Sequence, residues 1–122
     1  MSAHEEKGLQ SACLMRLAYL ENQGHCVAAR TAVFDGMIDV PRSARRIKVR
    51  MQTGREGWPD ITAVIHGKFV ALEMKAIAGR QSPIQKALQT KIEKAGGIYK
   101  LIHSVDELEE TIRELSKEVM HT

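Results

Sequence analysis

Two carboxylates and a lysine, Asp60, Glu73 and Lys75, are the side chains whose types and spacing could carry chemistry. Directly opposed like charges are unfavourable in a sheet, so a hairpin needed only for stability would rarely place Asp60 against Glu73. A divalent cation between them removes the repulsion, and Mg²⁺ prefers such oxygen ligands. The carbonyl of Met74 could add a third oxygen. Lys75 could deprotonate an attacking water or stabilise developing charge. The pattern therefore predicts metal-assisted hydrolysis of a phosphodiester, with Mg²⁺ or Mn²⁺.

The register of a hairpin brings the three residues together. Two runs rich in strand formers, 61–65 and 68–76, are separated by His66-Gly67, which is typical of a two-residue hairpin loop. In that register Ile65 pairs with Lys68, and Asp60 lies opposite Glu73. Opposed side chains share a face with Cβ atoms about 4.5–5.5 Å apart, and Lys75 shares that face as well.

A plainer interpretation of the same residues stays open. Asp60, Lys75 and Glu73 could form a surface salt-bridge trio, which contributes little to stability. A slip of one residue in the register would also separate the two carboxylates onto opposite faces.

The flanking elements predict an α/β fold, a mixed sheet flanked by helices in the core order α-β-β-β-α-β-α. These elements make up one domain over residues 1–122, and the 46–51 strand is an additional element outside the core order. We expect helices over about 4–23, from 83 to a Gly-Gly stop at 96–97, and over 105–119, with strands over 25–33, 46–51, 61–65, 68–76 and 98–103. Turn signals lie at Phe34-Asp35-Gly36 and Pro41-Arg42-Ser43.

The 46–51 strand predicts a surface for phosphates. Apolar and basic residues alternate strictly along it, which indicates a half-buried strand whose solvent-exposed face is wholly basic. The predicted DNA-binding residues are Arg42, Arg45, Arg46, Lys48, Arg50 and Arg55. Residues 106–118 balance to −4, which leaves a basic body and an acidic terminal helix. The basic body suggests a polyanionic partner on one face, although a solvated surface would explain it as well.

Composition excludes several classes of protein. The chain has 122 residues, 43% of them hydrophobic, which suits one globular domain. Apolar runs are too short for a membrane span, and the acidic start lacks an apolar stretch typical of a secretory signal. Two cysteines without a Cys-x-x-Cys pair suggest neither a zinc site nor a disulfide framework, so we expect a reducing, cytoplasmic location.

The motifs together resemble a nuclease family. Pro59-Asp60 followed by Glu73-Met74-Lys75 is similar to the motif of the PD-(D/E)XK nuclease superfamily. With Gly57-Trp58-Pro59-Asp60-Ile61, the segment from Gly79 to Gln85, Gly96-Gly97 and the run from Ser104 to Leu108, nearly the whole chain resembles a VRR-NUC domain.

The resemblance implies a restriction-endonuclease-like core and metal-dependent cleavage of branched DNA, such as flaps or four-way junctions. Small stand-alone members are typically phage-encoded and resemble Holliday-junction resolvases, which act as homodimers; their location is then the host cytoplasm. A dimer also suits a reaction that must nick two strands from one site per chain.

The resemblance also implies two further site residues. Glu6 is the expected counterpart of a family glutamate in the first helix, with Glu5 and Glu21 as alternatives, although the helix dipole alone favours an acid there. Gln85 is expected to touch the water or the scissile phosphate, while its other interpretation is a capping box with Ser82. Gln89, one turn later, either lines the same face of the helix or belongs to its ordinary solvent-exposed side.

Two rival functions remain open. A non-catalytic nucleic-acid-binding module would use the basic 42–55 segment, with the acidic residues merely structural. A sequence-specific restriction enzyme is disfavoured, because 122 residues leave little room for a recognition module.

Overall fold

A computed structural model describes residues 3–52, 55–76 and 79–120. Its elements follow the chain as α1 (Ala3–Asn22), β1 (Cys26–Arg30), β2 (Val33–Asp39), β3 (Arg46–Gln52), β4 (Ile61–Ile65), β5 (Lys68–Met74), α2 (Pro83–Lys94), β6 (Ile98–Ile102) and α3 (Val105–Met120). The predicted α/β class is confirmed, as are all three helices to within a residue or two.

The central sheet is mixed. Its strand order is β1-β4-β5-β6, with antiparallel pairing everywhere except between β5 and β6, which run parallel. The β4–β5 loop has the two residues expected, because Ile65 pairs with Lys68 and Ile61 with Leu72. His66 and Gly67 both take positive φ, 49° and 82°, as the twist of a two-residue hairpin demands.

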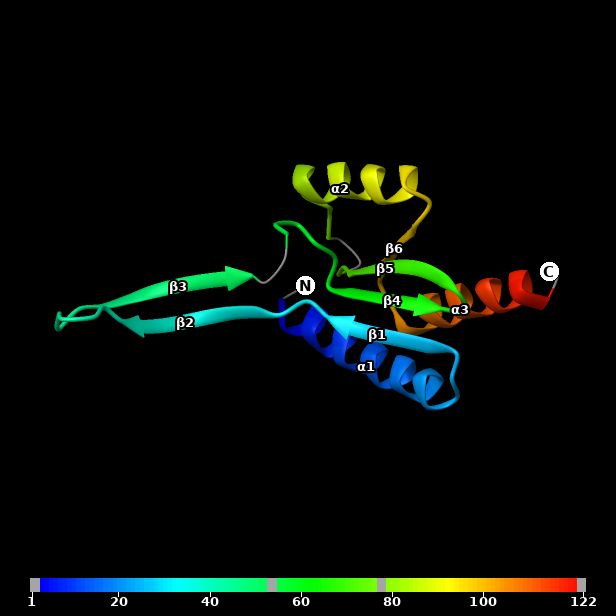
Figure 1. The fold of residues 1–122 in the computed structure, drawn as a ribbon, viewed down its shortest axis with the longest axis horizontal. Helices are drawn as coiled ribbons and strands as arrows, with labels where there is room; N and C mark the ends of the chain where they lie inside the picture. Colours follow the sequence, from blue (N-terminus) through cyan, green and yellow to red (C-terminus); the bar gives the residue numbers. More distant parts are fainter. Residues whose placement is uncertain (1–2, 53–54, 77–78, 121–122) are drawn as a thin grey trace.

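Helices cover both faces of this sheet (Figure 1). The main core lies on the side of α1 and α3, where buried residues such as Leu17, Leu72 and Leu108 pack together. A smaller core lies under α2, where Leu88 and Ile92 meet Ala71 and Tyr99. On that side the β1–β4 half of the sheet is bare: Val27, Val64 and Phe69 pair directly across three strands and are all exposed.

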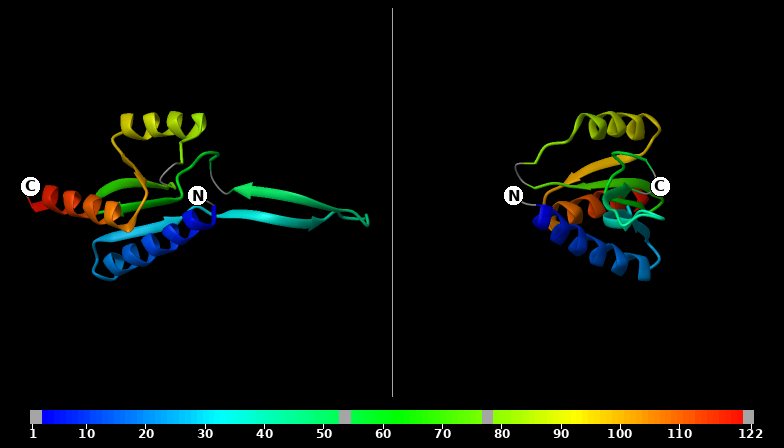
Figure 2. Two further views of the ribbon diagram at one scale, coloured as in Figure 1. Left: turned by 180° about the vertical axis from the view of Figure 1, so that it is seen from behind. Right: turned by 90° about the vertical axis from the view of Figure 1, so that its left-hand side faces the viewer.

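The strands β2 and β3 form a separate two-stranded ribbon. We call residues 33–52 the arm, because the ribbon projects far from the rest of the molecule in Figure 1 and in the left-hand view of Figure 2. It is inserted between β1 and β4, so the chain leaves the central sheet and returns to it. The remaining elements follow as α1, β1, β4, β5, α2, β6 and α3.

Three expectations for residues 25–51 are wrong. Phe34-Asp35-Gly36 lies inside β2 and is not a turn, and the strand expected over 25–33 ends at Arg30. The 46–51 segment is a strand, but it is not half-buried: Ile47 is exposed, as are Met37 and Ile38 on β2. Its strict alternation reflects two faces of a ribbon, neither of which belongs to the main core.

No helix within the described ranges is both long and apolar enough to cross a membrane.

Candidate functional site

Asp60 and Glu73 meet where β4 begins and β5 ends. The ladder ends with the pairing of Ile61 with Leu72, and one further step in the same register sets Asp60 opposite Glu73. The carboxylate of Asp60 reaches across the hairpin, and its Oδ2 accepts a hydrogen bond of 2.8 Å from the Met74 N–H. The Asp60 side chain is thereby fixed against the strand that carries Glu73.

Glu73 is a buried acid in an unfavourable environment. It is only 4% exposed, and its Oε2 has no hydrogen-bond partner among the described residues. Burial raises the pKa of Glu73 to about 9, helped by a hydrogen bond and charge repulsion from Asp60 and by the charge of Glu6, while Lys75 opposes the rise. A residue this buried does not fit the surface salt-bridge trio.

Lys75 stands just after β5. Its N–H donates to the carbonyl of Ile102 at 3.0 Å, which extends the parallel pairing past the end of the strand. Its side chain is half-buried, and its charge acts on Glu73. Asp60, Glu73 and Lys75 therefore share one neighbourhood, as the register predicted.

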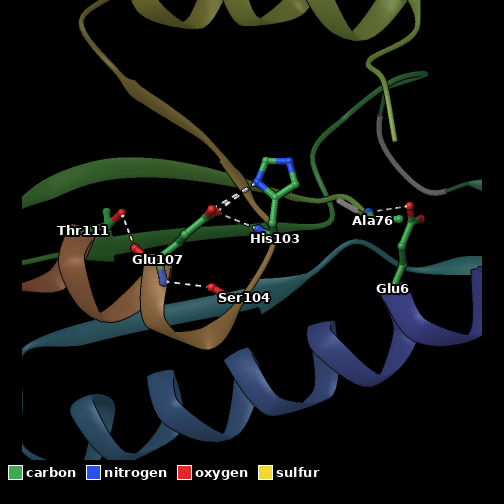
Figure 3. Close-up of polar contacts among 6 residues, drawn as sticks. All are labelled: Glu6, Ala76, His103, Ser104, Glu107 and Thr111. Carbon is green, nitrogen blue, oxygen red and sulfur yellow. Dashed lines mark hydrogen bonds and ion pairs between the residues drawn. The ribbon is translucent and has the colours of Figure 1, made fainter. Parts of the chain in front are cut away.

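The first helix brings a third acid to this place. Glu6, in the first turn of α1, accepts a hydrogen bond of 3.1 Å from the Ala76 N–H, through its Oε1 (Figure 3). Glu21 lies in the last turn of the same helix, where its Oε1 accepts from Ala28 N–H, and Glu5 is exposed. Of the three candidate acids, the structure brings Glu6 to the end of β5.

The base of the arm is attached to the same site. Thr31, in the link from β1 to β2, donates its N–H to the Asp60 carbonyl at 2.8 Å. Its hydroxyl also donates to the Pro59 carbonyl. The segment that positions Asp60 is therefore bonded to the start of the arm.

A polar path leads from Glu73 toward α2, and two of its residues, Tyr99 and Gln81, were given no role by the sequence reasoning. Tyr99 on β6 is buried, and its hydroxyl has no hydrogen-bond partner among the described residues. Burial raises its pKa to about 12, with Gln81 opposing the rise and the Glu73 and Asp60 charges adding to it. Gln81 in turn donates to Gln89 Oε1 at 2.9 Å. Alternation of side chains along β6 places Tyr99 on the same face of the sheet as Glu73. This alternation could have identified Tyr99 from the sequence.

Gln85 forms the capping box that starts α2. Its Oε1 accepts from Ser82 N–H at 2.9 Å, and its own N–H donates to the Ser82 hydroxyl at 3.2 Å. This is the structural interpretation weighed for Gln85, and a part in catalysis stays a prediction. Gln81 is the glutamine that acts on Tyr99, and Gln89 is bonded to Gln81.

A second polar cluster lies where β6 leads into α3. Glu107 accepts from the N–H of His103 at 2.7 Å and lies 3.0 Å from its Nδ1 (Figure 3). The hydroxyl of Ser104 accepts from the Glu107 N–H. Ser104 therefore caps the helix as expected, while the Glu107 carboxylate reaches one residue further back than a standard capping box.

The residues fit a divalent cation held by few protein ligands. In the described ranges no three His, Cys, Asp or Glu side chains lie close enough to make a cage. Mg²⁺ usually needs only one or two carboxylates, with waters and substrate phosphates completing its shell. Asp60 and Glu73 supply that pair, and the unpartnered Oε2 of Glu73 has a free lone pair for it. That the Met74 carbonyl and Glu6 also bind the ion stays a prediction.

The predicted DNA-binding residues lie on the arm and at its base. Arg42, Arg45, Arg46 and Lys48 are exposed there, and Arg55 is exposed between the arm and β4. The side chain of Arg50 lies outside the described part. Arg46 forms an ion pair of 3.0 Å with Asp39 across the arm, so the predicted basic face is partly neutralised at that position.

A scan of the sequence against models of protein families finds no match, and a search of curated proteins finds no relative.

Proposed function

We propose that the protein is a metal-dependent endonuclease that hydrolyses phosphodiester bonds in branched DNA. The observation that carries the proposal is the buried carboxylate of Glu73 at the end of β5, with the partly buried Asp60 beside it. Glu73 is buried away from water, one of its oxygens has no hydrogen-bond partner in the described part of the chain, and the charge of Asp60 acts on it. Such an arrangement costs stability in the free protein, and strain of this kind is typical of sites shaped for a ligand.

Each residue then has a separate task. Asp60, held by the Met74 N–H, and Glu73 together hold Mg²⁺ or Mn²⁺, which would polarise the phosphate and acidify a bound water. Lys75 would serve as a base toward the attacking water, or as a positive charge beside the phosphate. Glu6 keeps the end of β5 in place through Ala76 and adds negative charge near Glu73.

The motif resemblance supports the finer assignment. It favours a restriction-endonuclease-like core, a VRR-NUC-type domain and a Holliday-junction resolvase-like activity. Gln85 is retained as a contact to the water or the phosphate. A homodimer is part of the proposal, because a four-way junction needs two nicks and each chain offers one pair of carboxylates.

The test compares DNA structures with and without metal. The purified protein is incubated with a four-way junction, a flap and a linear duplex of the same sequence, in EDTA, Mg²⁺ or Mn²⁺. We expect Mg²⁺-dependent cutting of the branched substrates, absent from an Asp60→Asn variant. Sedimentation velocity with and without junction reports the dimer.

Two results would count against the proposal. Cutting of linear duplex at one sequence would indicate a restriction enzyme. Binding without cutting in either metal would leave the non-catalytic nucleic-acid-binding module, which uses the same basic residues.

A further inference from the structure

The arm carries the whole net charge of the protein. Residues 33–52 hold five basic and two acidic side chains, a balance of +3, which equals the formal net charge of the chain. The remaining residues therefore balance to zero. A polyanion will be drawn to the arm before any other part of the molecule.

The arm's two faces differ in character. Directly paired residues point to the same face: Ile38 pairs with Ile47, while Met37 pairs with Lys48 and Asp39 with Arg46. One face is therefore apolar and the other bears the charges. An isolated two-stranded ribbon is marginally stable in water, so we expect the arm to bind a partner. Its positive charge favours nucleic acid as that partner.

The tip of the arm is a tight turn that presents an arginine. The Ser43 N–H donates to the Val40 carbonyl at 3.2 Å and the Val40 N–H to the Arg45 carbonyl at 3.0 Å. Pro41 is second in this turn and Arg42 third, with φ of 63°, which is the type II pattern that normally takes glycine at that place. A side chain in this conformation costs stability, and strain of this kind clusters at functional positions.

The base of the arm starts at the candidate site. Thr31 binds the Asp60 carbonyl two residues before β2 begins. DNA with a phosphate at Asp60 and Glu73 would therefore lie where the arm leaves the body.

We propose that the arm is a finger that lies along a DNA duplex flanking the cut, with Arg42 at its tip contacting the backbone at a fixed distance. The inference rests on the proposed function for the position of the cut. A two-stranded ribbon fits the major groove, about 12 Å wide. Seven residues per strand, at about 3.3 Å each, reach about 23 Å. Because phosphates follow one another every ~3.4 Å along a strand, the tip meets DNA about seven nucleotides from the cut phosphate.

The first experiment measures affinity in EDTA, so it needs no cleavage. A fluorescein-labelled four-way junction is titrated with wild type, Arg42→Gly and a matched charge control, Arg113→Gln on the exposed side of α3. We expect Arg42→Gly to bind about tenfold more weakly, as for one charged hydrogen bond. Its slope of log affinity against log salt should fall by about 0.9, the share of one phosphate. Arg113→Gln should bind as wild type does.

Folding is monitored in the same variants. Glycine suits the positive φ of residue 42, so Arg42→Gly should be at least as stable as wild type in urea. Weaker binding by a protein of undiminished stability assigns the loss to the missing side chain.

The second experiment measures the reach. Both native cysteines, Cys13 and Cys26, are buried, and burial raises the pKa of each thiol, so an iron chelate will attach to Arg42→Cys selectively. Chelate-directed strand scission should centre about seven nucleotides from the Mg²⁺-dependent cut. The same chelate on Arg113→Cys should leave the junction intact.

The outcomes separate this inference from the proposed function. Weakened binding and tip-directed scission in a protein that never cuts would support the finger and refute the endonuclease. Unchanged affinity and salt slope in Arg42→Gly, with cutting intact, would overturn the finger alone. A change in sedimentation with unchanged DNA binding would assign the arm to a second copy of the chain and also overturn it.

Discussion

Glu73→Gln should change how stability depends on pH. An unfolded glutamate loses its proton near pH 4.5, whereas buried Glu73 keeps it until about pH 9. Between these values the folded state binds the extra proton, so stability falls as pH rises, by about 1.4 kcal/mol per pH unit. From pH 5 to pH 8 this amounts to about 4 kcal/mol. Glutamine resembles the protonated acid and does not titrate, so the variant lacks this slope.

The assay is urea unfolding at pH 5, 6, 7 and 8 without metal, followed by the fluorescence of Trp58, the single tryptophan. Wild type and Glu73→Gln should be similar at pH 5 and diverge as pH rises, with the variant more stable at pH 8. Glu110→Gln, an exposed position on α3, serves as the control and should keep the wild-type slope. The reasoning is refuted if the free energies of unfolding of wild type and Glu73→Gln differ by the same amount from pH 5 to pH 8. Glu73 would then ionise as a solvated acid.

Three further predictions concern the site and its supports. Asp60→Asn should abolish Mg²⁺-dependent cutting while junction affinity in EDTA stays near wild type, and near-normal cutting by this variant would remove Asp60 from the site. Lys75→Ala should keep or tighten Mn²⁺ binding in calorimetry while single-turnover cleavage falls by orders of magnitude; Lys75→Arg should not rescue it, because guanidinium does not readily give up its proton. Joint loss of metal and activity in Lys75→Ala would mean that the lysine organises the site. Gln85→Ala should lower the free energy of unfolding by about 1 kcal/mol through the lost capping box, and a larger loss of cleavage than of stability would show that Gln85 also acts in the reaction.

The candidate site was predictable because its register depends on local chemistry. His66-Gly67 can adopt the positive φ angles of a tight loop, and a two-residue loop fixes which residues face each other across β4 and β5. Glu6 is a different case, since its position follows from how α1 packs under the sheet, and an acid in a first helical turn carries no such information.

The arm was misread for a physical reason. Phe34-Asp35-Gly36 has the composition of a turn, yet its backbone is held extended by pairing with β3, a partner that local sequence does not reveal. Alternation in the 46–51 segment indicates a strand with two different faces, but it does not indicate whether another element packs on either face. Local sequence also did not reveal the contacts of Gln81, because its interactions with Gln89 and Tyr99 depend on how α2 packs over β6.

The hydrogen bond between Glu6 and Ala76 joins residues that are 70 positions apart. Closing so long a loop costs chain entropy before any contact repays it, and such non-local contacts slow folding. The strand that carries Glu73 also needs β6, made later in the chain, along its other edge. The acids should therefore come together late in folding. Hydrogen exchange should find the Ala76 amide opening together with the first turn of α1, well before the amides at the centre of β5.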